Sequence, residues 1–467
     1  MSLPGVRHHD LVIIGTGSGN SVIDSRFDDL DVAIIEHGTF GGTCLNVGCI
    51  PTKMYVYAAD VAETIRRSGR YGIDATVDKV RWTQIRDRVF DRIDPIAAAG
   101  REYRAERCPN VTVYLGHARF SGPKTLRVER SDGSGVDELS ADRIVIAAGG
   151  RPDVPAEVTA SGVPYETSDT IMRLDAVPER LIILGSGYIA TEFAHVFSAL
   201  GSRVSLVARS GVLLRGLDET LSRRFTELAA QRWDVHLGNP VTGLSGVAGD
   251  ITVRLTDGTE LGGDTVLVAT GRIPNSDRLD LPAADIPVHP DGRIVVDAQQ
   301  RTPVEGVWAF GDISSPYQLK HVANHEARVV AHNLTHPDAP RETDHRFVPC
   351  AVFTDPQIAT VGRTEAQCRA EGLDYTVKVQ AFGDVAYGWA MEDTTGLCKI
   401  IAERRGGRLL GAHLLGPQAS TLIQPLIQAM TFGLGAREMA TGQYWIHPAL
   451  PEVVENALLG LETDISS

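Results

Sequence analysis

The sequence predicts an α/β protein with two Rossmann-like dinucleotide-binding domains and a C-terminal α+β domain. The first observation is an apolar run with glycines, "LVIIGTGSGN", followed by a second apolar run, "VAIIEHG", which together indicate a strand, turn, helix and strand. The second observation is that the same pattern returns at "LIILGSGYIATEFAHVFSALGSRVSLVAR". The third is that this pattern stops after about Arg346, where strand-like runs and a long helical candidate follow.

Length and charge limit the classes of protein to which the chain can belong. A chain of 467 residues is too long for one hydrophobic core and suggests about two to four domains. The formal net charge of −14 gives no basic surface for nucleic acid or an anionic membrane. No apolar run approaches the roughly 20 residues that span a bilayer, and "MSLPGVRHHD" lacks the apolar core of a signal peptide. We therefore expect a cytoplasmic protein whose thiols are reduced by default.

The first glycine loop fits the dinucleotide fingerprint in its first two glycines. Gly15 allows the tight turn after the strand, and Gly17 lets the backbone approach a pyrophosphate. Glu36 ends the next strand, where a carboxylate can accept hydrogen bonds from ribose hydroxyls. Asn20 departs from the fingerprint, since Gly or Ala normally stands there, so we expect the first helix to be displaced or distorted. Ser18 and Gly19, which lie between Gly17 and Asn20, complete the expected site.

Two matched strand ends suggest that the second domain is inserted into the first. "RIVIAAGGRP" indicates a strand that enters a tight turn, with Pro152 and Pro155 marking a linker. "TVLVATGRIPN" repeats that pattern at the end of the second unit and contains Gly271, a candidate nucleotide contact. "GVWAFGDISS" is then the return of the chain to the first domain. The predicted segments are residues 1–151, 152–274, 275–345 and 346–467.

The second glycine loop is a full match to the fingerprint, with Gly185, Gly187 and then Ala190 in the third place. Its second strand ends at Ala208, where an acidic residue for NAD would stand. Arg209 follows directly, and Arg215 lies six residues on. Two guanidinium groups and no carboxylate favour a 2′-phosphate, and hence NADPH, over the alternative of two solvated loop arginines.

The C-terminal segment has a different pattern from the two glycine-loop units. "TVKVQAF" and "LCKIIAE" are strand-like runs, and "TLIQPLIQAMTFG" is a long helical candidate. We therefore predict a separate α+β domain.

Cys44 and Cys49 are separated by four residues in "GGTCLNVGCIPTK", within a chain of six cysteines. This spacing is unusual for zinc, and no second Cys or His pair follows at ligand spacing. A structural disulfide is unusual in a cytosolic protein, whereas two dinucleotide sites in one chain favour a redox dithiol. On an ideal helix residues i and i+5 point about 140° apart, so the segment must be irregular around Gly48 for a disulfide to close.

"GGTCLNVGCIPTK" resembles the active-site motif of the flavoprotein disulfide reductases, the glutathione reductase and dihydrolipoyl dehydrogenase group. The resemblance covers nearly the whole chain, because it includes the first glycine loop, both A-x-G strand ends, Gly311-Asp312 and the C-terminal "HPALPE". It implies an enzyme that uses FAD and NADPH to reduce a disulfide, with a C-terminal dimerisation domain and no metal. A flavin-binding sensor or redox regulator on the same scaffold is the alternative class.

The resemblance assigns the redox roles residue by residue. Cys49 is implied as the thiol next to the flavin, and Cys44 as the interchange thiol that attacks the substrate disulfide. His447 matches the family's catalytic base, which comes from the partner subunit of a homodimer, and Glu452 matches the carboxylate that orients it. The chemistry needs such a base, since a thiol of ordinary pKa is mostly protonated at about pH 7.

The resemblance also implies the cofactor contacts. Lys53, one helical turn after Cys49, matches a lysine near the flavin N5 that pairs with a glutamate, here Glu192. Tyr188 matches the aromatic residue that covers the flavin until NADPH displaces it. The implied FAD contacts are Gly15, Gly17, Ser18, Gly19, Glu36, Thr43, Lys53, Ala118 and Asp312. The implied NADPH contacts are Gly185, Gly187, Tyr188, Ile189, Glu192, Arg209, Arg215 and Gly271.

The substrate is the feature that the sequence determines least. Ala208 and Arg209 disfavour a dihydrolipoyl dehydrogenase, and the tail "LGLETDISS" lacks the cysteine pair of thioredoxin and mercuric reductases. The expected first helix, "SGNSVIDSRFDDLD", offers Arg26 as its only cation, which disfavours the carboxylates of glutathione and suits a neutral polyol.

"GTGSGNS" and "YWIHPALPEVVENALLGL" add a resemblance that favours mycothione, the disulfide of a cysteinyl pseudo-disaccharide. Glutathione disulfide or another low-molecular-weight disulfide is the alternative. We expect Ser21, Asp24 and Ser25 to lie near the sugar or inositol of mycothione.

The remaining cysteines and a histidine cluster have no spacing that indicates chemistry. We interpret Cys108, Cys350, Cys368 and Cys398 as packing residues. His321, His325 and Glu326 form no HExxH motif, so we expect them on a helix face near the flavin rather than around a metal.

Overall fold

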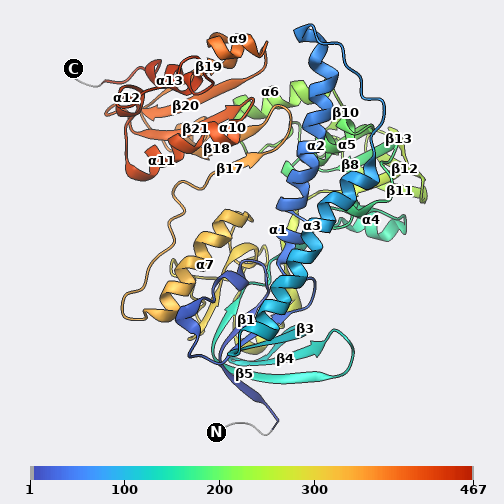
Figure 1. Ribbon diagram of the computed structural model, residues 1–467, viewed down its shortest axis with the longest axis vertical. Coiled ribbons are helices and arrows are strands. Elements are labelled where there is room, and N and C mark those ends of the chain that lie inside the picture. The colour runs from blue at the N-terminus through green and yellow to red at the C-terminus, as the bar shows by residue number, and fades with distance from the viewer. Residues whose placement is uncertain (1–4, 465–467) are drawn as a thin grey trace.

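The computed structural model describes residues 5–464, which form three units (Figure 1). The first sheet lies at one end of the molecule with the helix α7 (Lys320–Thr335) beside it. The second unit and the C-terminal unit lie at the other end, and α2 (Cys49–Arg67) and α3 (Trp82–Glu102) extend toward them from the first. None of the helices within residues 5–464 has the length and apolarity needed to cross a bilayer.

The first sheet combines a parallel part with an antiparallel extension. Strands β2, β1, β5 and β16 pair in parallel, and β3, β4 and β5 continue as an antiparallel meander. Strand β16 joins this sheet from far along the chain, which confirms the predicted return to the first unit. The strands are β1 (Arg7–Ile14), β2 (Val32–Glu36), β3 (Val111–Gly122), β4 (Thr125–Arg130), β5 (Val136–Ile146) and β16 (Val307–Ala309).

The second unit contains a parallel sheet in the order β10-β9-β8-β14-β7, and helix α5 (Tyr188–Ala199) packs against it. Its strands are β7 (Glu166–Thr167), β8 (Arg180–Leu184), β9 (Arg203–Ala208), β10 (Asp234–Leu237) and β14 (Thr265–Val268). An antiparallel sheet adds β11 (Val241–Val247), β12 (Asp250–Leu255) and β13 (Glu260–Gly263), and the other helices are α4 (Ala156–Ser161) and α6 (Glu219–Ala230).

Entry to and exit from the second unit lie side by side. Strand β6 (Gly150–Pro152) pairs antiparallel with β15 (Arg272–Pro274), so the two A-x-G segments that the sequence singled out are adjacent. This pairing supports an inserted domain, while the exact domain boundaries stay a prediction.

The C-terminal unit is an antiparallel five-stranded sheet covered by helices, as the change of pattern predicted. The expected long helix is divided into α10 (Ala419–Leu422) and α11 (Gln424–Phe432), because Pro425 starts a new helix. The strands are β17 (Cys350–Val352), β18 (Ile358–Gly362), β19 (Tyr375–Ala381), β20 (Leu397–Glu403) and β21 (Leu409–Leu415). The other helices are α8 (Glu365–Ala370), α9 (Ala386–Ala390), α12 (Ala436–Thr441) and α13 (Glu452–Leu459).

The helix expected between β1 and β2 is not an α-helix. Two short 3₁₀ turns, Gly19–Ser21 and Ser25–Phe27, take its place, so the predicted distortion at Asn20 is confirmed in a stronger form. Ser, Asn and Asp side chains favour such turns, and Asp24 caps the second one by accepting from the amide of Arg26. Arg104 holds the irregular backbone by donating to both oxygens of Asn20, at 2.8 Å and 2.9 Å.

Candidate active site

The two cysteines lie at the junction of two helices. Helix α1 (Gly42–Asn46) ends before Gly48, whose φ of −132° and ψ of −122° interrupt the helix, and α2 begins at Cys49. A Cβ atom on Gly48 would lie 2.9 Å from the carbonyl oxygen of Thr43 and 3.2 Å from the Cα of Cys44. The irregularity predicted around Gly48 is therefore confirmed, and the close approach leaves room only for glycine.

The two thiols are free and electrostatically unequal. A hydrogen bond from Cys44 is the main reason that the pKa of Cys49 falls to about 7, and the Lys53 charge lowers it against burial. The same hydrogen bond, together with burial, raises the pKa of the Cys44 thiol. Cys49 is therefore the sulfur that forms a thiolate near neutral pH, as expected of the thiol next to the flavin.

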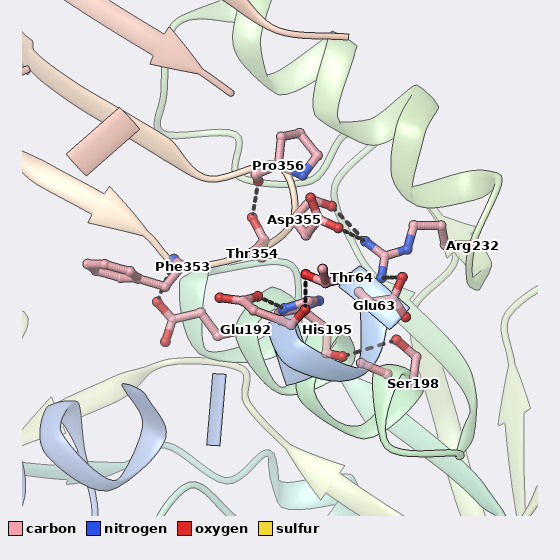
Figure 2. A network of polar contacts seen from close by, with 12 residues as sticks. Glu63, Thr64, Glu192, His195, Ser198, Arg232, Phe353, Thr354, Asp355 and Pro356 are labelled. Carbon is pink, nitrogen blue, oxygen red and sulfur yellow. Dashed lines mark hydrogen bonds and ion pairs between the residues drawn. The ribbon is translucent and has the colours of Figure 1, made fainter. Parts of the chain in front are cut away.

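The predicted pairing of Lys53 with Glu192 is confirmed. The Lys53 Nζ lies 2.5 Å from Oε2 of Glu192, which is buried on α5. The backbone N–H of Phe353, just after β17, donates to Glu192 Oε1 at 2.9 Å (Figure 2). The ring centroid of Phe353 also lies 4.7 Å from Lys53 Nζ, so this residue contacts both members of the pair. No motif in the sequence marks Phe353.

A cavity of about 800 Å³ opens beside Cys49. Ile50, Met54 and Tyr57 line it from one face of α2, at helical spacings that could have been recognised in the sequence. Arg88 and Arg92 of α3 line it as well. The surface next to the redox pair therefore contains arginine, so the scarcity of cations around Arg26 does not disfavour an anionic disulfide.

The first glycine loop fits a nucleotide. Gly15 has a φ of +100° and packs against the carbonyl of Ala147, where a Cβ would lie 2.4 Å from the oxygen. At Gly17 the nearest atom to an added Cβ is 3.8 Å away, and the amides of Gly17 and Ser18 have no acceptor within residues 5–464. Gly19 is buried and packs tightly on Ile13. Free amides next to an open face suit a pyrophosphate.

Glu36 takes part in this loop. Its carboxylate accepts from the amide and hydroxyl of Thr16, at 2.9 Å and 2.6 Å, and from the amide of Gly38 at 2.8 Å. A carboxylate offers about four acceptor positions, so capacity for a ribose hydroxyl remains. Glu36 also shapes the loop, a role that the sequence did not indicate.

The region around Asp312 has polar groups that a cofactor could satisfy. The hydroxyls of Ser314 and Ser315 are buried and have no partner in the described chain. Burial raises the pKa of Asp312, because desolvation disfavours its charged form. Thr43 is partly buried in α1, whereas the Ala118 side chain packs in the core, so only its backbone could face a cofactor.

The second glycine loop opens toward the first turn of α5. Gly185, at a φ of +138°, packs against the carbonyl of Ala269, and an added Cβ on Gly187 would meet nothing within 4 Å. Gly187 precedes α5 without a side-chain cap, which leaves the helix N-terminus available to an anion. Ile189 lies in the first turn, and Gly271 lies just before β15 with a φ of +151°.

Arg209 and Arg215 fit the predicted role in NADPH binding. Both side chains are exposed after β9, and neither has a hydrogen-bond or ion-pair partner among residues 5–464. Tyr188, also exposed, has a pKa raised to about 12, mainly by desolvation, with the charges of Asp312, Glu192 and Cys49 acting in the same direction. Its hydroxyl therefore stays protonated at neutral pH.

His447 and Glu452 form the predicted pair. The Nδ1 of His447 lies 2.6 Å from Glu452 Oε1, and Glu452 Oε2 accepts from the amide of Ala449 at 3.0 Å. The hydrogen bond to His447 lowers the pKa of Glu452. The His447 side chain is 72% exposed and does not line the cavity beside Cys49 in its own chain.

The residues expected near a sugar are exposed but lie outside that cavity. Ser21 donates to the carbonyl of Ser18, and Asp24 pairs with Arg26 at 2.6 Å. Ser25 is exposed at the start of the second 3₁₀ turn. Their contact with substrate stays a prediction.

The other residues that the sequence singled out have structural contacts. Cys368 and Cys398 are fully buried, while Cys108 and Cys350 are partly buried. Glu326 is buried on α7 and accepts from the Gly311 amide at 2.8 Å. Within residues 5–464 no cluster of His, Cys, Asp or Glu has the arrangement of a metal site.

Comparison with known proteins agrees with this geometry. The sequence model of the pyridine nucleotide-disulphide oxidoreductases matches residues 9–327, and that of their dimerisation domain matches residues 348–458. The mycothione reductase of Mycobacterium tuberculosis is 58% identical over 463 residues, 97% of this chain and 99% of that protein. The glutathione reductase of Burkholderia cepacia is 33% identical over 450 residues, 95% of this chain and 97% of that protein.

A solved structure has the same arrangement of elements. The HOCl-induced flavoprotein disulfide reductase RclA from Escherichia coli superposes with a TM-score of 0.85 at 28% identity, covering 97% of this chain and 99% of that one. With its paired cysteines, two glycine loops and matched dimerisation segment, the chain belongs to the pyridine nucleotide-disulphide oxidoreductase family.

Proposed function

We propose that this protein is an NADPH-dependent flavoprotein that reduces mycothione to mycothiol through FAD and the Cys44–Cys49 pair. The observation that carries the proposal is 58% identity over nearly the full length of a mycothione reductase, against 33% for a glutathione reductase. The glycine loops, the free arginines after β9 and the unequal thiols support the same chemistry. We further propose that the protein acts in the cytoplasm.

The chain's own residues bind and orient the two cofactors. Bound FAD supplies the means of passing an electron pair from NADPH to a disulfide. The loop from Gly15 to Gly19 and the Asp312 region would hold FAD, while the start of α5, Arg209 and Arg215 would hold NADPH. Lys53 and Glu192 lie next to Cys49, where the lysine charge favours the thiolate.

The reduced pair then exchanges with the substrate. Cys44 loses its proton to His447 and attacks one sulfur of mycothione, so that a mixed disulfide forms and the substrate S–S bond breaks. His447 returns the proton to the departing mycothiol. The Cys49 thiolate attacks Cys44, which restores the Cys44–Cys49 disulfide and releases the second mycothiol as a thiolate that takes a proton from solvent.

We propose that His447 acts on the cysteines of the partner subunit in a homodimer. The exposed His447 and its absence from the cavity of its own chain support this arrangement. Exposed apolar side chains surround both regions, with Tyr444 and Ile446 near His447 and Ile50 and Tyr57 near Cys49.

Co-expression of Cys44→Ser and His447→Ala chains tests this arrangement. Each homodimer is expected to be inactive with mycothione. About half of a random mixture is heterodimer with one intact site of two, so about a quarter of wild-type activity should return. No recovered activity in purified heterodimers would place His447 with the cysteines of its own chain.

The substrate is tested by one assay panel, in which NADPH and NADH are crossed with mycothione, glutathione disulfide and lipoamide. We expect the highest kcat/KM for NADPH with mycothione. Glutathione disulfide is the second candidate, because Arg88 and Arg92 beside the cavity could pair with its carboxylates. A higher kcat/KM for glutathione disulfide would replace the proposed substrate.

A further inference from the structure

A series of polar contacts connects the redox site to the C-terminal unit (Figure 2). It begins at Phe353, which donates its N–H to Glu192 and lies over the Lys53 ammonium. This residue follows β17, so a segment of the C-terminal unit contacts both members of the ion pair beside Cys49. Thr354, which is buried, stiffens the segment by donating to the carbonyl of Pro356 at 2.7 Å.

Arg232, from the second unit, holds the turn that follows Phe353. Its Nη1 donates to the carbonyl oxygen of Asp355 at 2.6 Å, and its Nη2 lies 3.5 Å from Glu63 Oε2 on α2. Arg67 of α2 closes the network, with Nη1 2.6 Å from Asp355 Oδ2 and Nη2 3.1 Å from Glu63. Arg232 therefore ties the turn to the helix that carries Cys49 and Lys53.

Arg232 and Glu63 are the more enclosed members of this network. The side chain of Arg232 is 22% exposed and that of Glu63 is 14% exposed. Replacing enclosed ion networks by apolar residues is often neutral or stabilising, so stability alone gives no account of this one. Its geometric effect is to fix where the Phe353 segment meets α2 and α5.

We propose that Phe353 positions the Lys53–Glu192 pair beside Cys49, and that Arg232 is the positioning residue that holds Phe353 in place. The inference rests on the proposed redox role of Cys49, but it is independent of which disulfide is the substrate.

The Phe353 contacts affect the stability of the Cys49 thiolate. The charge of Lys53 favours the thiolate and that of Glu192 opposes it. Without the Phe353 contacts, the Lys53 side chain, already 34% exposed, can turn toward solvent, and the thiolate loses its nearest cation. The other titratable groups that face the two thiols stay in place, namely Tyr188 of α5 and Lys320 of α7.

The experiment compares wild type with Arg232→Gln, Arg232→Lys and Phe353→Leu as flavin-loaded enzymes. Each is reduced by NADPH without oxygen. The long-wavelength charge-transfer absorbance between the Cys49 thiolate and the bound flavin is then recorded as a function of pH. We expect Arg232→Gln to raise the pH midpoint of this absorbance by about one unit. At a pH below the midpoint, the variant then holds about tenfold less thiolate than wild type. Arg232→Lys should keep the midpoint close to that of wild type. Phe353→Leu, which keeps the backbone N–H, should give a smaller rise.

Arg224→Gln is the matched control. Arg224 also lies in the second unit, and its Nη2 donates to the carbonyl of Thr394 in the C-terminal unit at 3.1 Å, away from the redox pair. Its midpoint should equal that of wild type. An unchanged midpoint in Arg232→Gln and Phe353→Leu overturns the proposal, as does an equal shift in Arg224→Gln. If Arg232→Gln does not fold, the Phe353→Leu midpoint decides. Absence of the band in wild type would instead contradict the redox role of Cys49.

Discussion

At the scale of single residues, cofactor choice rests on Arg209 and Arg215. Neither guanidinium has an intramolecular partner among the described residues, so both can bind a 2′-phosphate at little cost. Replacing both by Gln should raise the KM for NADPH by about a hundredfold or more, because charge-assisted hydrogen bonds contribute about 1.5 to 3 kcal/mol each. The KM for NADH should change little. Steady-state kinetics with both nucleotides checks this, and equal losses for the two would contradict it.

Single residues also show where sequence reasoning ends. Lys53, Glu192, His447 and Glu452 were placed from motifs, and each forms its expected pair. Phe353 was missed because its contact with Glu192 joins residues 161 positions apart and uses a backbone N–H, which any residue type supplies. No local pattern marks such a residue.

At the scale of elements, the first glycine loop and α1 pack closely against each other. Gly42 has a φ of +69°, and a Cβ there would lie 2.6 Å from the Cα of Gly17. Gly42→Ala should therefore strain the loop by about 1 to 3 kcal/mol and weaken FAD binding. Flavin released on ultrafiltration measures this. Gly69→Ala, where an added Cβ meets nothing within 4 Å, is the control and should retain FAD.

The elements were predicted well where periodicity is strong and poorly where side chains compete with the backbone. The apolar runs predicted the central strands β1, β2, β5 and β16 of the first sheet and β8, β9 and β14 of the second. In the C-terminal unit they predicted β19 and β20. The segment from Gly19 to Phe27 was expected to be helical, but Asn20 and Asp24 bond to Arg104 and to the backbone instead. A helix pattern of nine residues cannot outweigh such contacts, which depend on a side chain far away in the sequence.

At the scale of the whole molecule, a buried lysine joins the second unit to the C-terminal unit. Lys399 is 1% exposed, and its Nζ lies 2.8 Å from Oδ1 of Asp218, before α6, and 2.7 Å from Oε2 of Glu365, in α8. Burial alone would raise the pKa of Asp218, but hydrogen bonds from Lys399 and from the Glu365 amide outweigh it and lower that pKa.

Lys399→Met should destabilise the protein at pH 7 by about 3 to 5 kcal/mol, because Asp218 would stay buried without its cation. A carboxyl with a lowered folded pKa stabilises the protein above its unfolded pKa of about 3.9 and loses this contribution as pH falls through the folded value. The difference between wild type and variant should therefore shrink below about pH 4. Unfolding midpoints at several pH values test this, with Lys378→Met on β19 as the control. A difference that is constant with pH would contradict it.

The break between α1 and α2 also bears on the reduction potential of the protein. Cys44 and Cys49 are separated by only four residues, so a disulfide between them closes a very short loop and changes the chain entropy little. The reduction potential of the Cys44–Cys49 couple must then be set mainly by local charge, which means by Lys53 and the groups that position it. For a two-electron couple, each tenfold change in this balance moves the potential by about 30 mV. The partly enclosed network around Arg232, which does not touch the sulfur atoms, would thus adjust how strongly the protein reduces its substrate.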